Sequence, residues 1–311
     1  MPEHLSSHDN LSEIREILNR HYPFSIHQVE KHRDWIGAVY FVRGASGQFV
    51  WKLYRPFHRE NALNTIDILR FLEQEGYPAA RICPTQEGAG FLDICTPQGP
   101  CVALLYNRAQ GTEPQLPQSL AAIGRQCARL HLLMQRCPAP MLSRGKEHLL
   151  GRYLAFLKRV GFPQSKLEDL SNYADELWGR LQSAQPGFCH GDFHCGNMLE
   201  TPSGEFVLLD FDAAGLSYPI LDAATLCDGT DYFHFDPSGY GRTGQNLEQF
   251  LEGYTRETSL TRLPCVYDAI ALRHYDIQAT IADCQGYSLP FLEEQHAWLM
   301  QWRALCEQRM P

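Results

Sequence analysis

The chain has 311 residues and a formal net charge of −9. Apolar residues make up 44% of it and charged residues 20%, which is too apolar for an intrinsically disordered protein. The acidic balance, without clusters of lysine and arginine, argues against nucleic acid as the main partner, although a phosphorylated ligand stays compatible because local charge decides its binding.

The first part of the chain predicts a small lobe of mixed structure. Helical spacing of apolar residues alternates there with segments that are rich in β-forming residues. The expected elements, in chain order, are a helix over 11–20 capped by Asn10 or Ser12, a hairpin with strands over 38–42 and 48–54, a helix over 61–75, and short strands near 90–95 and 100–106.

After residue 107 the pattern changes to long helices, interrupted by one β-rich island at 198–212. The helices are expected over 119–135, 149–160, 167–183 and from 247 onward. We therefore predict an α+β fold with a small β-sheet lobe at residues 1–106 and a larger, mainly helical lobe at 107–311. A protein with two lobes usually binds its ligand in the cleft between them.

The segment His190–Asn197 and the β-rich island after it carry the clearest chemistry. Asp192 and Asn197 lie on a predicted loop, and Asp210 follows the second strand of a predicted hairpin. The hairpin turn, Thr201–Gly204, brings Asp210 back beside Asn197. An amide oxygen and a carboxylate at one hairpin base suit a hard cation such as Mg²⁺. Asp192 is placed to orient a hydroxyl group instead.

The sequences HGDFHCGN at 190–197 and LLDFD at 208–212 resemble the aminoglycoside phosphotransferase and choline kinase superfamily, which has a protein-kinase-like fold. Its pattern is HGDxxxxN followed by a strand that ends in an aspartate. The helix ending in Leu130-His131 and the segment Phe250–Tyr254 are also similar to this family. Residues 52–111 resemble its branch of bacterial stress-response and spore-coat kinase-like proteins. The likeness spans roughly residues 30 to 280.

The resemblance implies a phosphotransferase that uses ATP and Mg²⁺. Asp192 matches the catalytic aspartate, which orients the acceptor hydroxyl and takes its proton late. Asn197 and Asp210 match the metal ligands, and Lys52 matches the strand lysine that contacts the α- and β-phosphates. His190 would fix the catalytic loop by hydrogen bonds.

Other parts of the nucleotide site follow the family pattern less closely. The segment 33–38, which would approach the phosphates, contains Gly37 as its only glycine. The hinge that would bind adenine through its backbone matches Leu104, Leu105 and Tyr106.

The helix glutamate that should pair with Lys52 is also displaced. Family spacing puts Asn64 at its place, so that Glu60 or Asp67 would have to form the pair after a register shift. Asp212 replaces the glycine of the usual triplet, where it could support the metal or cap a turn. A weakly held Lys52 would fit a nucleotide-binding scaffold without catalysis.

The acceptor is less defined. Residues 228–236 combine aromatic residues with Asp228, Asp231, Tyr232 and Asp236, which would suit the wall of a site for an amine or equally a loop that packs its aromatics on the helical lobe. The expected acceptor is the hydroxyl of a small molecule such as an amino alcohol, sugar or antibiotic. A protein serine or threonine is the alternative that the stress-response kinases imply.

Two histidines four residues apart, His190 and His194, could bind zinc on a helix, but the glycines beside them favour a loop. His131, at the end of an apolar helix, is interpreted as a structural histidine. The 11 cysteines include no CxxC pair, and the N-terminus has no signal-peptide pattern. These features, together with the lack of an apolar run of membrane-spanning length, favour a cytoplasmic protein with reduced thiols, in which Cys195 lies inside the catalytic loop.

Overall fold

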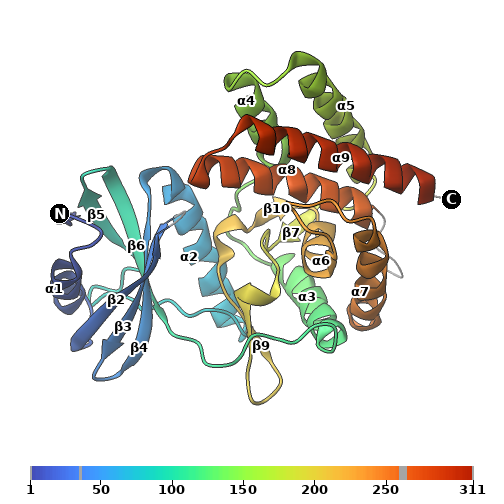
Figure 1. The fold of residues 1–311 in the computed structure, drawn as a ribbon. Coiled ribbons are helices and arrows are strands. Elements are labelled where there is room, and N and C mark those ends of the chain that lie inside the picture. Colours follow the sequence, from blue (N-terminus) through green and yellow to red (C-terminus); the bar gives the residue numbers. More distant parts are fainter. Residues whose placement is uncertain (1, 35–36, 259–264, 310–311) are drawn as a thin grey trace. The chain divides into compact units, whose positions relative to one another are not determined.

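The computed structural model describes residues 2–34, 37–258 and 265–309, and it divides the chain into two compact units (Figure 1). The first unit contains Met1–Glu113, Pro138–Pro140 and Gly196–Ala213, and the second contains Pro114–Cys137, Met141–Cys195 and Ala214–Pro311. In this division the first segment of the first unit ends at residue 113, and the change of lobe near residue 106 stays a prediction. The predicted metal-binding hairpin belongs to the first unit and not to the helical lobe.

A six-stranded sheet in the order β1-β5-β6-β4-β3-β2 forms the centre of the first unit. All its neighbouring strands are antiparallel except β1 and β5. Its strands are β1 (Glu3–His4), β2 (Ile26–Asp34), β3 (Gly37–Gly44), β4 (Gly47–Tyr54), β5 (Leu92–Thr96) and β6 (Gly99–Asn107). The predicted hairpin is β3–β4, which closes with Gly44 opposite Gly47.

Two helices accompany this sheet, α1 (Leu11–His21) and α2 (Arg59–Gln74), and both were predicted. The Asn10 side chain caps α1 by accepting the Glu13 N–H at 3.2 Å. One core cluster joins the buried face of α1 to Tyr40 and Trp51 of the sheet. This packing removes the apolar stripe of α1 from water, which is the main stabilising contribution of an amphipathic helix.

The hairpin of β8 (Met198–Glu200) and β9 (Phe206–Leu208) is tied to the first unit by backbone bonds. Thr112 and Glu200 exchange two N–H···O bonds of 3.0 and 2.7 Å, and the Ala80 N–H donates to the Leu208 carbonyl at 2.8 Å. These bonds explain why the hairpin belongs to this unit, although it lies far along the chain from the six-stranded sheet.

The second unit is mainly helical, with one small antiparallel sheet of β7 (Gly187–Cys189) and β10 (Gly215–Ser217). Its helices are α3 (Leu120–Met134), α4 (Arg152–Arg159), α5 (Gln164–Leu181), α6 (Ile220–Cys227), α7 (Ser238–Tyr254), α8 (Val266–Gln285) and α9 (Leu289–Arg309). The helices α8 and α9 lie side by side (Figure 1) and bury Tyr275, Trp298 and Trp302 in the main core cluster. None of the described helices has the length and apolarity that crossing a membrane requires.

Candidate active site

The β8–β9 hairpin holds the two predicted metal ligands at its base. The Leu209 N–H donates to the Asn197 carbonyl at 2.8 Å, so Asp210 directly follows the residue that is bonded to Asn197. Asp210 has a φ of 57°, a left-handed conformation that aspartate tolerates better than most residues. The hairpin thus carries an amide and a carboxylate side chain at its base, the oxygen donors that hard divalent cations prefer.

Lys52, on the central strand β4, forms ion pairs with the residues after this hairpin. Its ammonium group lies 2.8 Å from the Asp210 carboxylate and 2.5 Å from that of Asp212. Burial by itself lowers the pKa of Lys52, but the two carboxylates outweigh it and hold the pKa above its ordinary value. The lysine therefore stays protonated at neutral pH. Arg33, at the end of β2, adds a second cation 3.3 Å from Asp210.

The expected partners of Lys52 on α2 do not contact it. Glu60 and Asp67 are exposed, and within the described residues the carboxylates paired with Lys52 are those of Asp210 and Asp212. The register of α2 buries Thr65 instead, whose hydroxyl donates to the Phe211 carbonyl at 3.2 Å. The helix thus supports the segment that carries Asp210 and Asp212 without supplying the acid itself.

Two tyrosines complete this cluster: Tyr54, which sequence reasoning missed, and Tyr106, which was predicted as part of the hinge. The Tyr54 hydroxyl donates to Asp212 at 2.8 Å and lies 2.9 Å from the Tyr106 hydroxyl. Burial and the nearby Asp210 carboxylate both raise the pKa of Asp212. Together they outweigh the opposing effect of Lys52, and the pKa of Asp212 is about 6. Strand periodicity could have found Tyr54, since residues 52 and 54 share one face of β4.

Gly37 and the predicted hinge have structural roles within the sheet. A Cβ at Gly37 would lie 2.7 Å from the Leu53 carbonyl oxygen, so the close approach of β3 and β4 itself requires a glycine. Trp35 and Ile36, in the segment predicted to approach the phosphates, lie outside the described residues.

Leu104–Tyr106, predicted as the hinge at the end of the last strand of the small lobe, lie in the last part of β6. Leu104 opposes Lys52 in the sheet, and the Leu105 carbonyl accepts the Cys83 N–H at 2.7 Å. Tyr106 opposes Val50, so this stretch is paired along both edges of the strand. Its backbone is engaged within the sheet, and the strand ends only at Asn107.

In the second unit, Asp192 is held by a residue that no motif indicated. Arg273 of α8 donates to the Asp192 carboxylate at 2.7 Å and to the Gly191 carbonyl at 3.0 Å. The His194 imidazole lies 3.4 Å from the other carboxylate oxygen. Burial raises the pKa of Asp192, but His194 and Arg273 reverse this effect and hold the pKa well below its usual range. The carboxylate is therefore ionised at neutral pH.

A buried aspartate on α6 fixes the same loop. Asp222 accepts the backbone N–H groups of His190 and Gly191 at 2.7 and 2.9 Å. His131 lies 3.0 Å from Asp222 through one ring nitrogen and 2.9 Å from the Tyr254 hydroxyl through the other. His131 therefore has the structural role expected of it. His190 is fully buried, and its ring nitrogen accepts the Asp192 N–H at 3.4 Å, a long contact in the loop that it was predicted to fix.

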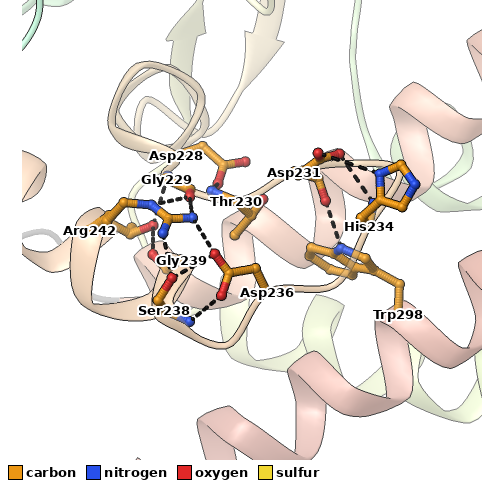
Figure 2. Close-up of polar contacts among 11 residues, drawn as sticks. Asp228, Gly229, Thr230, Asp231, His234, Asp236, Ser238, Gly239, Arg242 and Trp298 are labelled. Carbon is orange, nitrogen blue, oxygen red and sulfur yellow. Dashed lines mark hydrogen bonds and ion pairs between the residues drawn. The ribbon is translucent and has the colours of Figure 1, made fainter.

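The predicted substrate wall separates into two parts. Asp231 accepts the N–H of Phe233, and Asp236 accepts the N–H and hydroxyl of Ser238, so these two acids fold the loop locally. Figure 2 shows Arg242 pointing into the loop, where it donates to the Gly229 carbonyl and to Asp236. Asp228 and Tyr232, by contrast, are partly buried.

The amino-acid sequence is similar to that of a known bacterial protein. An uncharacterized protein of Deinococcus radiodurans is 30% identical over 164 residues, which are 50% of this chain and 48% of that protein. The chain thus matches about half the length of this relative.

Two solved structures share the fold across almost the whole chain. An amicoumacin kinase in complex with AMP-PNP, Ca²⁺ and Ami has a TM-score of 0.77 and 22% identity, covering 98% of this chain and 95% of that one. A microcompartment-associated aminopropanol kinase has a TM-score of 0.76 and 20% identity, covering 96% and 97%. These likenesses confirm the predicted α+β, protein-kinase-like fold. The model of the phosphotransferase enzyme family matches residues 28–259, and the chain therefore belongs to that family, as its loop and hairpin motifs predicted.

Proposed function

We propose that the protein transfers the γ-phosphoryl group of ATP to a hydroxyl group of a small molecule. The observation that carries this proposal is the pairing of Lys52 with Asp210 at the base of the hairpin that also holds Asn197, in a member of the phosphotransferase enzyme family. A largely buried lysine that is charged at neutral pH, beside oxygen ligands, is the arrangement that triphosphate binding needs.

Each charged residue has a proposed role. Lys52 binds the phosphates, and Asn197 and Asp210 would hold a divalent cation, since an amide and a carboxylate fit Mg²⁺. Such a cation would offset charge on the phosphates when bound. Asp192 orients the acceptor hydroxyl and accepts its proton as the oxygen bonds to the γ-phosphorus and the bond to ADP breaks. We place the backbone contact with adenine after Asn107, where β6 ends.

The acceptor is proposed to be a small molecule that carries an amine. Two solved structures that share this fold are named as an amicoumacin kinase and an aminopropanol kinase. The loop at residues 228–236 adds acidic and aromatic side chains, which favour a cationic ligand. A protein serine or threonine remains an outcome of the test.

The test is ADP release by purified protein with ATP and Mg²⁺ across amino alcohols, sugars, aminoglycosides and a metabolite extract. We expect turnover with an amine-bearing hydroxyl compound and its loss in EDTA. Asp192→Asn should reduce kcat by ~100-fold or more, because a general base contributes about that factor. Glu87→Gln, an exposed acid in a turn, should leave kcat unchanged.

Two outcomes would contradict this proposal. Phosphopeptides without any phosphorylated metabolite would support a protein kinase instead. Nucleotide binding without turnover, equal in wild type, Asp192→Asn and Asp210→Asn, would support a non-catalytic scaffold.

A further inference from the structure

Arg273 is the most deeply buried charged contact of the predicted catalytic aspartate. Its side chain is 11% exposed and comes from α8, 81 positions after Asp192 in the chain. The guanidinium spans the Asp192 carboxylate and the Gly191 carbonyl at 2.7 and 3.0 Å, so it fixes both the side chain and the backbone of this loop. Because the guanidinium is planar and rigid, two such contacts define the orientation of the carboxylate.

Residues 228–237 precede α7, and we call this segment the acceptor loop. Tyr232 of this loop lies near Arg273 and Asp228, which shift the pKa of its hydroxyl in opposite directions. Asp228 is itself anchored, because one of its carboxylate oxygens accepts the Thr230 N–H at 2.8 Å. Asp192 is thus bonded to Arg273, and Arg273 lies near Tyr232 of the acceptor loop.

The acceptor loop is firmly attached at several points (Figure 2). Arg242 donates to the Gly229 carbonyl at 2.9 and 2.7 Å, and the Trp298 indole N–H donates to the Asp231 carbonyl at 2.8 Å. The Gln278 amide donates to the Tyr232 carbonyl at 3.2 Å, which holds the backbone beside this tyrosine. These contacts leave the acceptor loop little freedom to rearrange. The loop can therefore constrain the position of Arg273 beside it.

We infer that Arg273 is a positioning residue for Asp192, and that its neighbour Tyr232 in the acceptor loop limits where the guanidinium can lie. The inference rests on the proposed function, in which Asp192 is the base. The same loop that would contact the acceptor thereby sets the orientation of the carboxylate that receives the acceptor proton. Acceptors that displace Tyr232 would then be bound and yet phosphorylated slowly.

The charge of Arg273 gives the inference a measurable signature. The charged and titratable groups that face this pair are His194 and Arg273 around Asp192, and Tyr232 and Asp276 around Arg273. Without the guanidinium, burial would raise the pKa of Asp192, and His194 would oppose the shift. The acid limb of the pH profile should then move to higher pH.

The experiment compares Arg273→Gln, Arg273→Lys and Tyr232→Phe with wild type. Arg273→Gln should lower kcat by ~10-fold or more and change the KM for ATP less than ~2-fold, because it disturbs the base and not the nucleotide site. Its acid limb should rise by ~1 pH unit or more. Arg273→Lys should restore part of kcat, and Tyr232→Phe should give a smaller loss. Arg303→Gln, which breaks a surface pair with Glu176, serves as the matched control.

A second measurement separates this inference from the proposed function. A ¹³C NMR titration of the Asp192 carboxyl needs no acceptor and should report a higher pKa in Arg273→Gln than in wild type. If wild type phosphorylates no acceptor, the proposed function is wrong. The titration still shows whether Arg273 lowers the pKa of Asp192. An unchanged pKa, or an acid limb and kcat equal to wild type in Arg273→Gln and Tyr232→Phe, would overturn the inference.

Discussion

For Lys52, the sequence predicted the strand that carries the residue but not the carboxylates that pair with it. Its motif predicted a phosphate-binding lysine, and it does lie on the second strand of the predicted hairpin. Its partners were predicted on α2, yet they are Asp210 and Asp212, 158 and 160 positions away in the chain. Spacing within a helix can be counted from sequence, but a contact between distant segments depends on tertiary packing, which no local pattern records.

The identity of these partners leads to a prediction at the residue scale. Asp212→Asn removes one of two carboxylates beside Lys52 and should weaken nucleotide binding by ~3- to 10-fold, a loss typical of a half-buried ion pair. Glu60→Gln and Asp67→Asn change exposed acids and should leave the affinity within ~2-fold. Calorimetric titration with a non-hydrolysable ATP analogue measures all three. An effect of Glu60→Gln as large as that of Asp212→Asn would restore the predicted helix pair.

At the element scale, the crossing of α3 and α7 explains two glycines in the segments that resemble the family. A Cβ at Gly253 would lie 1.7 Å from the Ala121 carbonyl oxygen, and one at Gly124 would lie 2.2 Å from that of Phe250. The two helices therefore approach until backbone meets backbone. This packing holds His131 and Tyr254, one on each helix, within 2.9 Å of each other.

The same crossing supports a prediction on stability. Gly253→Ala should lower the free energy of unfolding by ~2 kcal/mol or more, because the helices must separate to admit the methyl group. Gly241→Ala lies on the same helix with open space around its Cβ, and it should raise stability by roughly 0.5–1 kcal/mol through helix propensity. Urea denaturation of both variants checks the contrast. Equal shifts would mean that the crossing tolerates a side chain at Gly253.

Helices and strands were easier to predict from the sequence than contacts between distant residues. The strands that were missed lack a clear apolar pattern. The helices α1, α2, α3 and α5 have clear apolar periodicity and were predicted close to their bounds. β2 was missed, because its sequence from Ile26 to Asp34 is largely polar and its residues are mostly exposed at the edge of the sheet. β7 and β10 were missed because strands of three residues are too short to show alternation and, unlike β8 and β9, no turn motif joins them.

At the scale of the whole molecule, the chain does not divide at one point. The predicted lobes are contiguous in sequence, whereas the first unit also includes Gly196–Ala213, which bonds through its backbone to Pro78, Ala80 and Thr112. As a result, the predicted base belongs to one unit and the predicted metal ligands to the other, although five positions separate Asp192 from Asn197. Sequence order alone could not assign the hairpin, since its partners lie more than 80 residues earlier.

The acid stability of the protein should depend on one buried histidine. His274 of α8 is fully buried and stacks on Trp298 of α9 with ring centroids 4.0 Å apart. Burial lowers its pKa to about 3, although a contact with Gln295 opposes the shift. Between about pH 3 and the ordinary histidine value near 6.5, the unfolded chain therefore binds a proton that the folded chain does not. Stability consequently falls as the pH drops below about 6.5.

This linkage gives a prediction that urea denaturation at several pH values can check. Between pH 6 and 4.5, wild type should lose up to ~1.4 kcal/mol per pH unit more than His274→Gln, which has no imidazole to protonate. His234→Gln changes a histidine that is 86% exposed and should keep the wild-type slope. The comparison uses the slope of the free energy of unfolding against pH. A loss of ring stacking in His274→Gln lowers stability equally at every pH and does not change this slope. Parallel curves for wild type and His274→Gln would mean that His274 is protonated within the folded protein.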